Sequence, residues 1–273
     1  MMISKKVVVI GAGAAGLMAG ATAALYGASV TIIEKNKRVG RKIMITGKGR
    51  CNLANNCDVQ TFINNVPVNG RFLYSAINAF TPEDTIEFFE SKGLKTKTER
   101  GNRVFPASDK SVDVVDTMHD YAVESGCKIV CDTANALILE DGAVIGVKCE
   151  ENTYYADSVI ICCGGKSYPL TGSTGDGYTL AKQAGHTIVP LKPSLVPFTS
   201  GDKQCKDMQG LALKNVALRI VDKNSKKTVY SDFGEMLFTH FGMSGPMILS
   251  ASSHIRDIQP DRYIAEIAVS YTH

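Results

Sequence analysis

The chain has 273 residues, enough for one large domain or two smaller ones. Its 44% hydrophobic and 21% charged residues are ordinary for a soluble globular protein. A net charge of +3 is too small to indicate nucleic-acid or membrane binding. No apolar run is long enough to cross a bilayer or to serve as a signal peptide, so we expect a cytoplasmic protein.

The first 34 residues carry the pattern of a nucleotide-binding unit. The apolar run 7–10 predicts a strand buried on both faces, as in a parallel sheet. The G-x-G-x-x-G sequence of residues 11–16 follows, then a predicted helix over 17–26. A second predicted strand over 29–33 ends at Glu34. This order of strand, glycine turn, helix, strand and acid is typical of a dinucleotide site.

The residue types of the turn suit a dinucleotide phosphate. Gly11 permits a tight turn, Gly13 lets the backbone approach a pyrophosphate, and Gly16 lets helix and strand pack closely. The N–H groups and the positive dipole end of the helix favour the phosphates, and Glu34 is placed to bind ribose hydroxyls. The alternative is a glycine-rich turn that binds nothing.

A basic loop follows the second strand. Residues 35–50 are dense in Gly, Lys and Arg, which predicts an ordered functional loop. Its cations meet a pyrophosphate in one interpretation and form a solvated loop in the other; composition favours neither. The cations concerned are Lys35, Arg38, Arg41 and Lys42. A glutamate followed by such a segment is more typical of FAD proteins than of NAD dehydrogenases, so we expect FAD.

Periodicity and turn residues predict the remaining elements. Helices are expected over 71–80, from Pro82 (capped by Thr81) to Gly93, from Ser108 as N-cap to Gly126, over 178–184 and over 246–253. Hairpins are expected over 94–105 and 135–150, and further strands over 128–131, 156–163, 211–221, 227–231, 234–241 and 264–269. Three prolines at 190, 193 and 197 indicate a domain boundary.

The eight cysteines show neither a C-x-x-C pair nor zinc spacing, so no metal site is expected. Without an export signal, most should be reduced thiols. Cys162 and Cys163 are adjacent at a predicted strand end. Two buried side chains are the preferred interpretation there, and a redox-active disulfide is the alternative.

Several motifs resemble those of the BaiN/RdsA-type NAD(P)/FAD-dependent oxidoreductases. They span the chain nearly end to end, and lie at residues 40–42, 46–52, 103–108, 164–177 and 234–246. The resemblance implies an α/β fold: a Rossmann-like FAD-binding domain of the glutathione-reductase type with a β-hairpin crossover. It also implies a mainly β insert domain. We expect the first at residues 1–194 and the second at 195–273.

The resemblance also implies which residues lie beside the cofactor. Gly11, Gly13, Ala14, Ala15 and Gly16 would hold the pyrophosphate, and Glu34 the adenosine ribose. Lys35, Arg41 and Lys42 would lie beside FAD, and Gly49, Arg50, Cys51 and Asn52 would approach the flavin. Gly164, Gly165, Thr174, Gly175, Asp176 and Gly177 would border the cofactor from a second loop.

In the resembling family the chain leaves the insert and returns to finish the FAD domain. Here residue 273 still lies within the expected insert. This indicates an incomplete chain, and it predicts an exposed apolar surface where a later segment would pack.

The expected activity is transfer of hydride from NAD(P)H through flavin to an unsaturated small-molecule acceptor. His240 and Tyr168 are candidate proton donors, although structural roles are preferred for both. Arg50 and Arg103 are candidates for an anionic group. Three alternatives stand beside this activity: FAD binding without turnover, a thiol–disulfide enzyme using Cys51 or the adjacent pair, and FAD-dependent tRNA modification, which the low net charge disfavours.

Overall fold

The computed structural model describes residues 4–255 and 258–269. The chain divides into two compact units. One comprises Met1–Ile63 and Leu73–Val189, and the other comprises Asn64–Phe72 and Pro190–His273. The expected domain limits of 1–194 and 195–273 stay a prediction, and the sequence did not predict that 64–72 belongs with the later unit.

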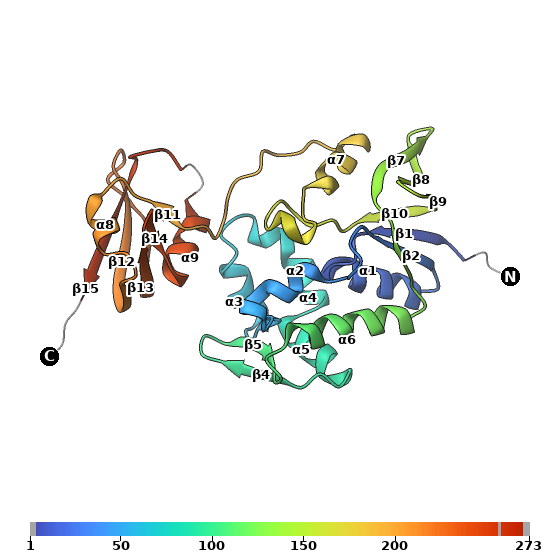
Figure 1. The fold of residues 1–273 in the computed structure, drawn as a ribbon, viewed down its shortest axis with the longest axis horizontal. Coiled ribbons are helices and arrows are strands. Elements are labelled where there is room, and N and C mark those ends of the chain that lie inside the picture. The colour runs from blue at the N-terminus through green and yellow to red at the C-terminus, as the bar shows by residue number, and fades with distance from the viewer. Residues whose placement is uncertain (1–3, 256–257, 270–273) are drawn as a thin grey trace. The chain divides into compact units, whose positions relative to one another are not determined.

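The first unit is built on a parallel four-stranded sheet in the order β10-β1-β2-β6 (Figure 1). Two small antiparallel sheets, β3-β5-β4 and β7-β8-β9, accompany it. Its strands are β1 Lys6–Ile10, β2 Ser29–Glu34, β3 Ala54–Asn55, β4 Thr96–Glu99, β5 Arg103–Pro106, β6 Lys128–Cys131, β7 Ala134–Glu140, β8 Ala143–Cys149, β9 Thr153–Tyr155 and β10 Ser158–Ile161. Its helices are α1 Ala14–Leu25, α2 Arg41–Ile45, α3 Val59–Asn64, α4 Tyr74–Ala79, α5 Pro82–Ser91, α6 Ser111–Glu124 and α7 Asp176–Gln183, with 3-10 turns η1 Thr46–Gly49 and η3 Pro169–Thr171. The 3-10 turn η2 Gly70–Leu73 falls mostly in the second unit.

Side chains alternate between the two faces of the parallel sheet, and each face has its own core. Val9 and Ile32 pack with Leu17 of α1 and with Val114 and Met118 of α6. The other face buries Val8, Ile10 and Ile33 against Leu137, Val147 and Leu180, which come from β7, β8 and α7. Because both faces are covered, most residues of these strands are apolar, as is usual for parallel strands. The predicted α/β fold with a parallel sheet is confirmed.

The second unit holds an antiparallel sheet in the order β11-β14-β13-β12-β15. Its elements are β11 Phe198–Thr199, α8 Lys203–Asp207, β12 Ala212–Asp222, β13 Thr228–Thr239, β14 Gly242–Ser244, α9 Pro246–His254 and β15 Tyr263–Val269. Leu218, Ile220, Met236 and Phe238 of the sheet form a core with Ile248 of α9. The expectation of a mainly β unit after the proline-rich segment is therefore confirmed in its fold class.

Several expected boundaries were wrong. Helix α1 begins at Ala14 rather than at residue 17, because Gly13 already serves as its N-cap. Ser108 does not cap α6: the N-cap is Lys110, and the Ser108 hydroxyl donates to the Asp113 carboxylate at 2.6 Å. The crossover after β6 is a three-stranded sheet rather than a hairpin, because β9 pairs with β8. Residues 228–239 form one strand where two were expected.

Candidate functional site

A cavity of about 900 Å³ lies in the first unit, lined by residues that follow β1, β2 and β10. These strands run parallel and pair directly, with Ile10 opposite Ile33 on one side and Ile161 on the other. Their carboxyl ends therefore meet at one edge, and the loops beyond them lie together. Ligands of open α/β sheets bind at this edge. The volume is also within the range of small-molecule and cofactor sites.

The glycine turn forms one wall of this cavity. Gly11 has a φ of +101°, which favours glycine, and its N–H donates to the Ile33 carbonyl at 2.7 Å. A Cβ on Gly16 would lie 1.7 Å from the Gly11 carbonyl oxygen, whereas a Cβ on Gly13 would meet no atom within 4 Å. Gly16 thus brings helix and strand together, and Gly13 leaves open space beside the start of α1.

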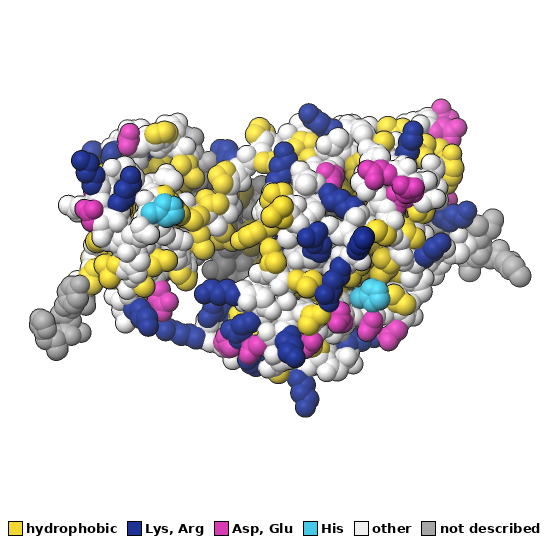
Figure 2. Space-filling view, in the orientation of Figure 1, with side chains coloured by type: hydrophobic (Ala, Val, Ile, Leu, Met, Phe, Trp, Pro, Cys, Tyr) yellow, Lys and Arg dark blue, Asp and Glu magenta, His cyan; other side chains and the backbone are white. Residues whose placement is uncertain are grey.

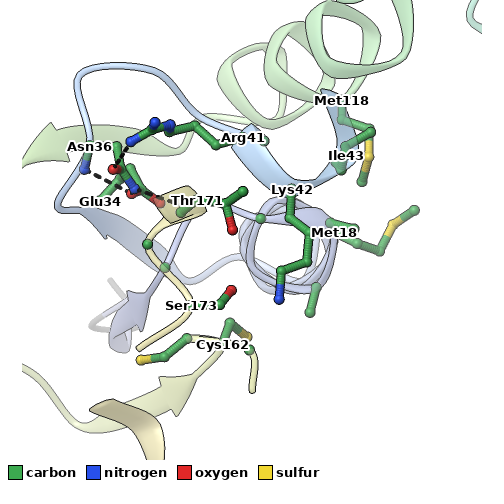
Figure 3. Close-up of a pocket in the computed structure, with 18 of the residues that line it drawn as sticks. Met18, Glu34, Asn36, Arg41, Lys42, Ile43, Met118, Cys162, Thr171 and Ser173 are labelled. Carbon is green, nitrogen blue, oxygen red and sulfur yellow. Dashed lines mark hydrogen bonds between the residues drawn. The ribbon is translucent and has the colours of Figure 1, made fainter. Parts of the chain in front are cut away.

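Glu34 organises the loop that begins at the end of β2. It is 8% exposed. One carboxylate oxygen accepts from the Ala12 N–H at 2.8 Å, and the other accepts from the N–H and Nδ2 of Asn36 at 2.8 and 2.6 Å (Figure 3). The Asn36 side-chain oxygen accepts in turn from Arg41 at 2.7 Å. A carboxylate has about four lone-pair positions, and three of those of Glu34 are occupied by these bonds, while the residue also lines the cavity.

A second loop closes the cavity from the β10 side. Lys35 Nζ lies 2.6 Å from the Asp176 carboxylate at the start of α7, and donates to the Thr174 hydroxyl at 2.8 Å. Burial acts to raise the pKa of Asp176, but the hydrogen bonds from Lys35 and Thr174 and the Lys35 charge outweigh it and lower that pKa. Lys42 Nζ donates to Ser167 at 3.2 Å. These bonds tie the loop after β2 to the loop after β10.

Arg50 lies away from the cavity lining. Its side chain binds both Glu99 and Asp109, the latter at 2.7 Å, and stacks on Phe105 with 4.2 Å between the guanidinium carbon and the ring centroid. The neighbouring backbone is left-handed at Gly47, Lys48, Gly49 and Cys51. Non-glycine residues in that region carry strain and are held there by their surroundings. Arg50 therefore anchors a strained turn.

The structure brings most of the expected cofactor residues to one cavity. Those that line it are Gly11, Gly13, Ala14, Ala15, Glu34, Lys35, Arg41, Lys42, Cys51, Asn52, Gly164 and Asp176. The expected residues outside its lining are Gly16, Gly49, Arg50, Gly165, Thr174, Gly175 and Gly177. Cofactor contact by any of them stays a prediction.

Neither candidate proton donor lines the cavity. Tyr168 is 67% exposed and caps the short turn η3 with a positive φ of 54°. His240 is an exposed residue of the second unit, and its ring meets the Phe241 ring edge-on with centroids 4.9 Å apart. The structure therefore gives neither Tyr168 nor His240 the role of a catalytic acid at this cavity.

The thiols near the site are poor nucleophiles. Burial raises the pKa of Cys51 and of Cys162, and burial with the nearby Asp176 charge raises that of Cys163 to about 11. Every cysteine in the described part of the chain is a free thiol, and no group of metal-ligating side chains occurs there.

Three residues that line the cavity were not singled out from the sequence. Asn36 couples Glu34 to Arg41, as described above. Asp132, after β6, is 5% exposed and accepts from the N–H groups of Thr133, Glu151 and Asn152, which joins the start of β7 to the turn between β8 and β9. Ser173 is a buried hydroxyl of the second loop. The sequence offered one signal for these three residues: Asn36 follows Glu34 by two positions, and Asn side chains stabilise such turns.

Basic side chains gather over the part of the first unit that contains α2 (Figure 2). Lys37, Arg38 and Arg41 are exposed there. Among the residues described, no helix is long and apolar enough to cross a membrane.

A model of the HI0933-like protein Rossmann domain matches residues 5–251. The chain belongs to this family. The chain is 31% identical over 250 residues to the 3-dehydro-bile acid delta(4,6)-reductase of Clostridium scindens, covering 90% of this chain and 59% of that protein. It is 30% identical over 259 residues to the ribosomal RNA dihydrouridine synthase of Escherichia coli, covering 94% and 62%. The resemblance in motifs is thus confirmed at the level of the family.

A solved structure supports the fold. The 3-ketosteroid-delta4-(5alpha)-dehydrogenase of Rhodococcus jostii matches with a TM-score of 0.52 and 14% identity, covering 82% of this chain and 67% of that one. The chain spans about 60% of the length of the curated relatives it matches.

Proposed function

We propose that the chain binds FAD in the cavity of the first unit and forms part of a flavin-dependent reductase. The observation that carries this proposal is the cavity itself, where the glycine turn, Glu34 and the second loop converge at the carboxyl edge of a parallel sheet. Family membership supports it, since the matching relatives are named as a reductase and as a dihydrouridine synthase.

The residues present fit a dinucleotide. Gly13 leaves the room that a phosphate needs at the start of a twelve-residue helix, whose N–H groups and dipole favour an anion. Glu34 lines the cavity as well. Lys42 and Arg41 line the same cavity and place positive charge beside it. When bound, FAD supplies hydride chemistry, with NAD(P)H as the proposed donor.

The proposed acceptor is a carbon–carbon double bond conjugated to a carbonyl. Both names above describe saturation of such a bond, one in a steroid-like small molecule and one in a uracil base. We favour a small molecule, because the net charge is only +3. The basic surface over α2 keeps RNA as a second candidate, and the substrate test below includes it.

The first experiment records the visible spectrum of the purified chain with FAD, then adds NADPH or NADH anaerobically. A bound flavin band that bleaches supports both the cofactor and the donor. A band that persists supports the alternative of binding without the nicotinamide reaction. No bound flavin at saturating FAD overturns the proposal. NADPH oxidation is then compared with a 3-oxo-4,6-diene steroid and with unmodified ribosomal RNA as acceptors.

A further inference from the structure

The tip of the loop after β10, residues 168–170, is apolar and exposed. Tyr168 is 67% exposed and Leu170 is 88% exposed, and Pro169 between them is exposed as well. Single apolar side chains are normal on a protein surface, but here two large ones stand within three residues of each other. Their apolar surface leaves water only when another group covers it.

The backbone of Tyr168 is held in a strained conformation. Its φ of +54° lies in the left-handed region, which bulky side chains rarely adopt. Two hydrogen bonds maintain the turn, since the N–H and the hydroxyl of Thr171 both donate to the Tyr168 carbonyl, at 2.9 and 2.7 Å. Strain that neighbouring groups maintain in this way is typical of binding sites. The turn therefore fixes the point from which the Tyr168 ring extends.

The tip stands at the rim of the cavity. Gly164 near one end of the loop and Thr171 at the other both line the cavity, and the tip lies between them in the chain. Lys42, which also lines the cavity, donates to the hydroxyl of Ser167 at 3.2 Å. A molecule that approaches a bound dinucleotide across this part of the rim therefore passes the exposed tip.

We propose that Tyr168 and Leu170 form a platform for the conjugated ring of the acceptor, and that Tyr168 contributes the face of its ring rather than its hydroxyl. The inference rests on the proposed function, since it places one part of the substrate of the same site. The double bond of the proposed acceptor is conjugated to a carbonyl, so that part of the molecule is planar and packs well on an aromatic face. Because neither side chain lines the cavity, a dinucleotide held there leaves the tip open to this second molecule.

The test measures binding of a 3-oxo-4,6-diene steroid to the FAD-loaded 273-residue chain by equilibrium dialysis. Tyr168→Phe keeps the ring and removes the hydroxyl. Tyr168→Asn removes the ring, and because Asn tolerates a left-handed backbone it should melt at or above the wild-type temperature. Tyr155→Asn is the matched control, because Tyr155 is 65% exposed, belongs to β9 and lies outside the cavity lining.

We expect Tyr168→Asn to weaken steroid binding on the order of 10-fold, and Leu170→Ala to weaken it in the same direction. Tyr168→Phe and Tyr155→Asn should bind the steroid as the wild type does, and all four variants should keep wild-type FAD affinity. Equal steroid affinity in Tyr168→Asn and the wild type overturns the platform. So does a loss in Tyr168→Phe as large as that in Tyr168→Asn, or an equal loss of FAD affinity.

The wild-type chain separates this inference from the proposed function. Wild-type protein that binds FAD but not the steroid overturns the platform and leaves the cofactor proposal standing. Wild-type protein that binds no FAD overturns the proposed function, and this inference with it. A wild-type dimer that Tyr168→Asn dissociates, measured by sedimentation, overturns the platform by assigning the tip to contact with a second copy of the chain.

Discussion

Alanine should have different effects at positions 13 and 16: Gly16→Ala should lower the stability of the fold, and Gly13→Ala should lower the affinity for FAD. In Gly16→Ala the new Cβ would lie 1.7 Å from the Gly11 carbonyl oxygen, and this backbone atom has no flexible side chain to move aside. Helix α1 and the turn must separate, which disrupts the packing of Leu17 and its neighbours. Overpacking of this kind costs about 3 kcal/mol or more.

In Gly13→Ala the new Cβ would meet no atom within 4 Å, and the backbone, at φ −83° and ψ −171°, is extended and open to alanine. The lower preference of alanine for an N-cap and the smaller entropy of its unfolded chain act in opposite directions, leaving a net change of about 1 kcal/mol or less. The methyl group, however, enters the space that the pyrophosphate needs. FAD affinity should fall by at least about 10-fold, the equivalent of 1.4 kcal/mol.

Thermal melts and FAD titrations of both variants check this reasoning. A loss of about 3 kcal/mol lowers the melting temperature by roughly 6–12 °C in a unit of this size, so Gly16→Ala should melt well below the wild type. Gly13→Ala should melt within about 4 °C of it. A wild-type melting temperature for Gly16→Ala, or wild-type FAD affinity for Gly13→Ala, would refute the assigned roles.

Three further predictions concern stability and thiol chemistry. Asp176→Asn should lower the melting temperature at pH 7; because the folded-state pKa of Asp176 is lowered, its contribution is present above about pH 4 and fades as the pH falls through the folded value, so a gap from wild type that does not narrow as the pH falls below about 4 contradicts this. Thr81→Ala breaks the capping box of α5 and should cost about 1 kcal/mol, or roughly 2–4 °C in a melt; an unchanged melt would dismiss the cap as a stabilising feature. Cys163, with a pKa of about 11, holds on the order of 0.1% thiolate at pH 8 and should label slowly in folded protein and quickly in urea; equal rates would argue against its burial.

Local signals predicted the elements whose geometry depends on a few neighbouring residues. Thr81 caps α5 as expected, with its hydroxyl accepting from the Asp84 N–H at 3.1 Å. The turn at Asp141 and Gly142 has φ values of +49° and +78°, which such a hairpin requires and which these residue types tolerate. Gly16 belongs to the same class, since a Cβ there would meet the Gly11 carbonyl oxygen of the same strand–helix unit. Gly11 does not, because a Cβ there would meet the Cys162 carbonyl oxygen from the distant segment after β10.

Elements that depend on distant pairing were harder to predict. The polar stretch at Ser231 and Asp232 looks like a break between two strands, yet β13 continues through it because β12 pairs opposite, with Arg219 facing Ser231 and Leu218 facing Asp232. Strand β9 has only three residues and is defined by its pairing with β8. Strand propensity depends on such neighbours more than helix propensity does.

The partners that the side chains of a motif bind were the hardest feature to predict from the sequence. Arg50 belongs to a motif that the resemblance places beside the flavin, but its guanidinium is held by Glu99 and Asp109, which lie 49 and 59 residues away. A planar guanidinium meets two carboxylates and an aromatic face at once, which lysine does not. Arg50 therefore holds the turn from which Cys51 and Asn52 line the cavity. This structural role does not require Arg50 itself to touch a ligand. Resemblance locates a functional segment, and only the contacts separate the residues that support it from those that face the cavity.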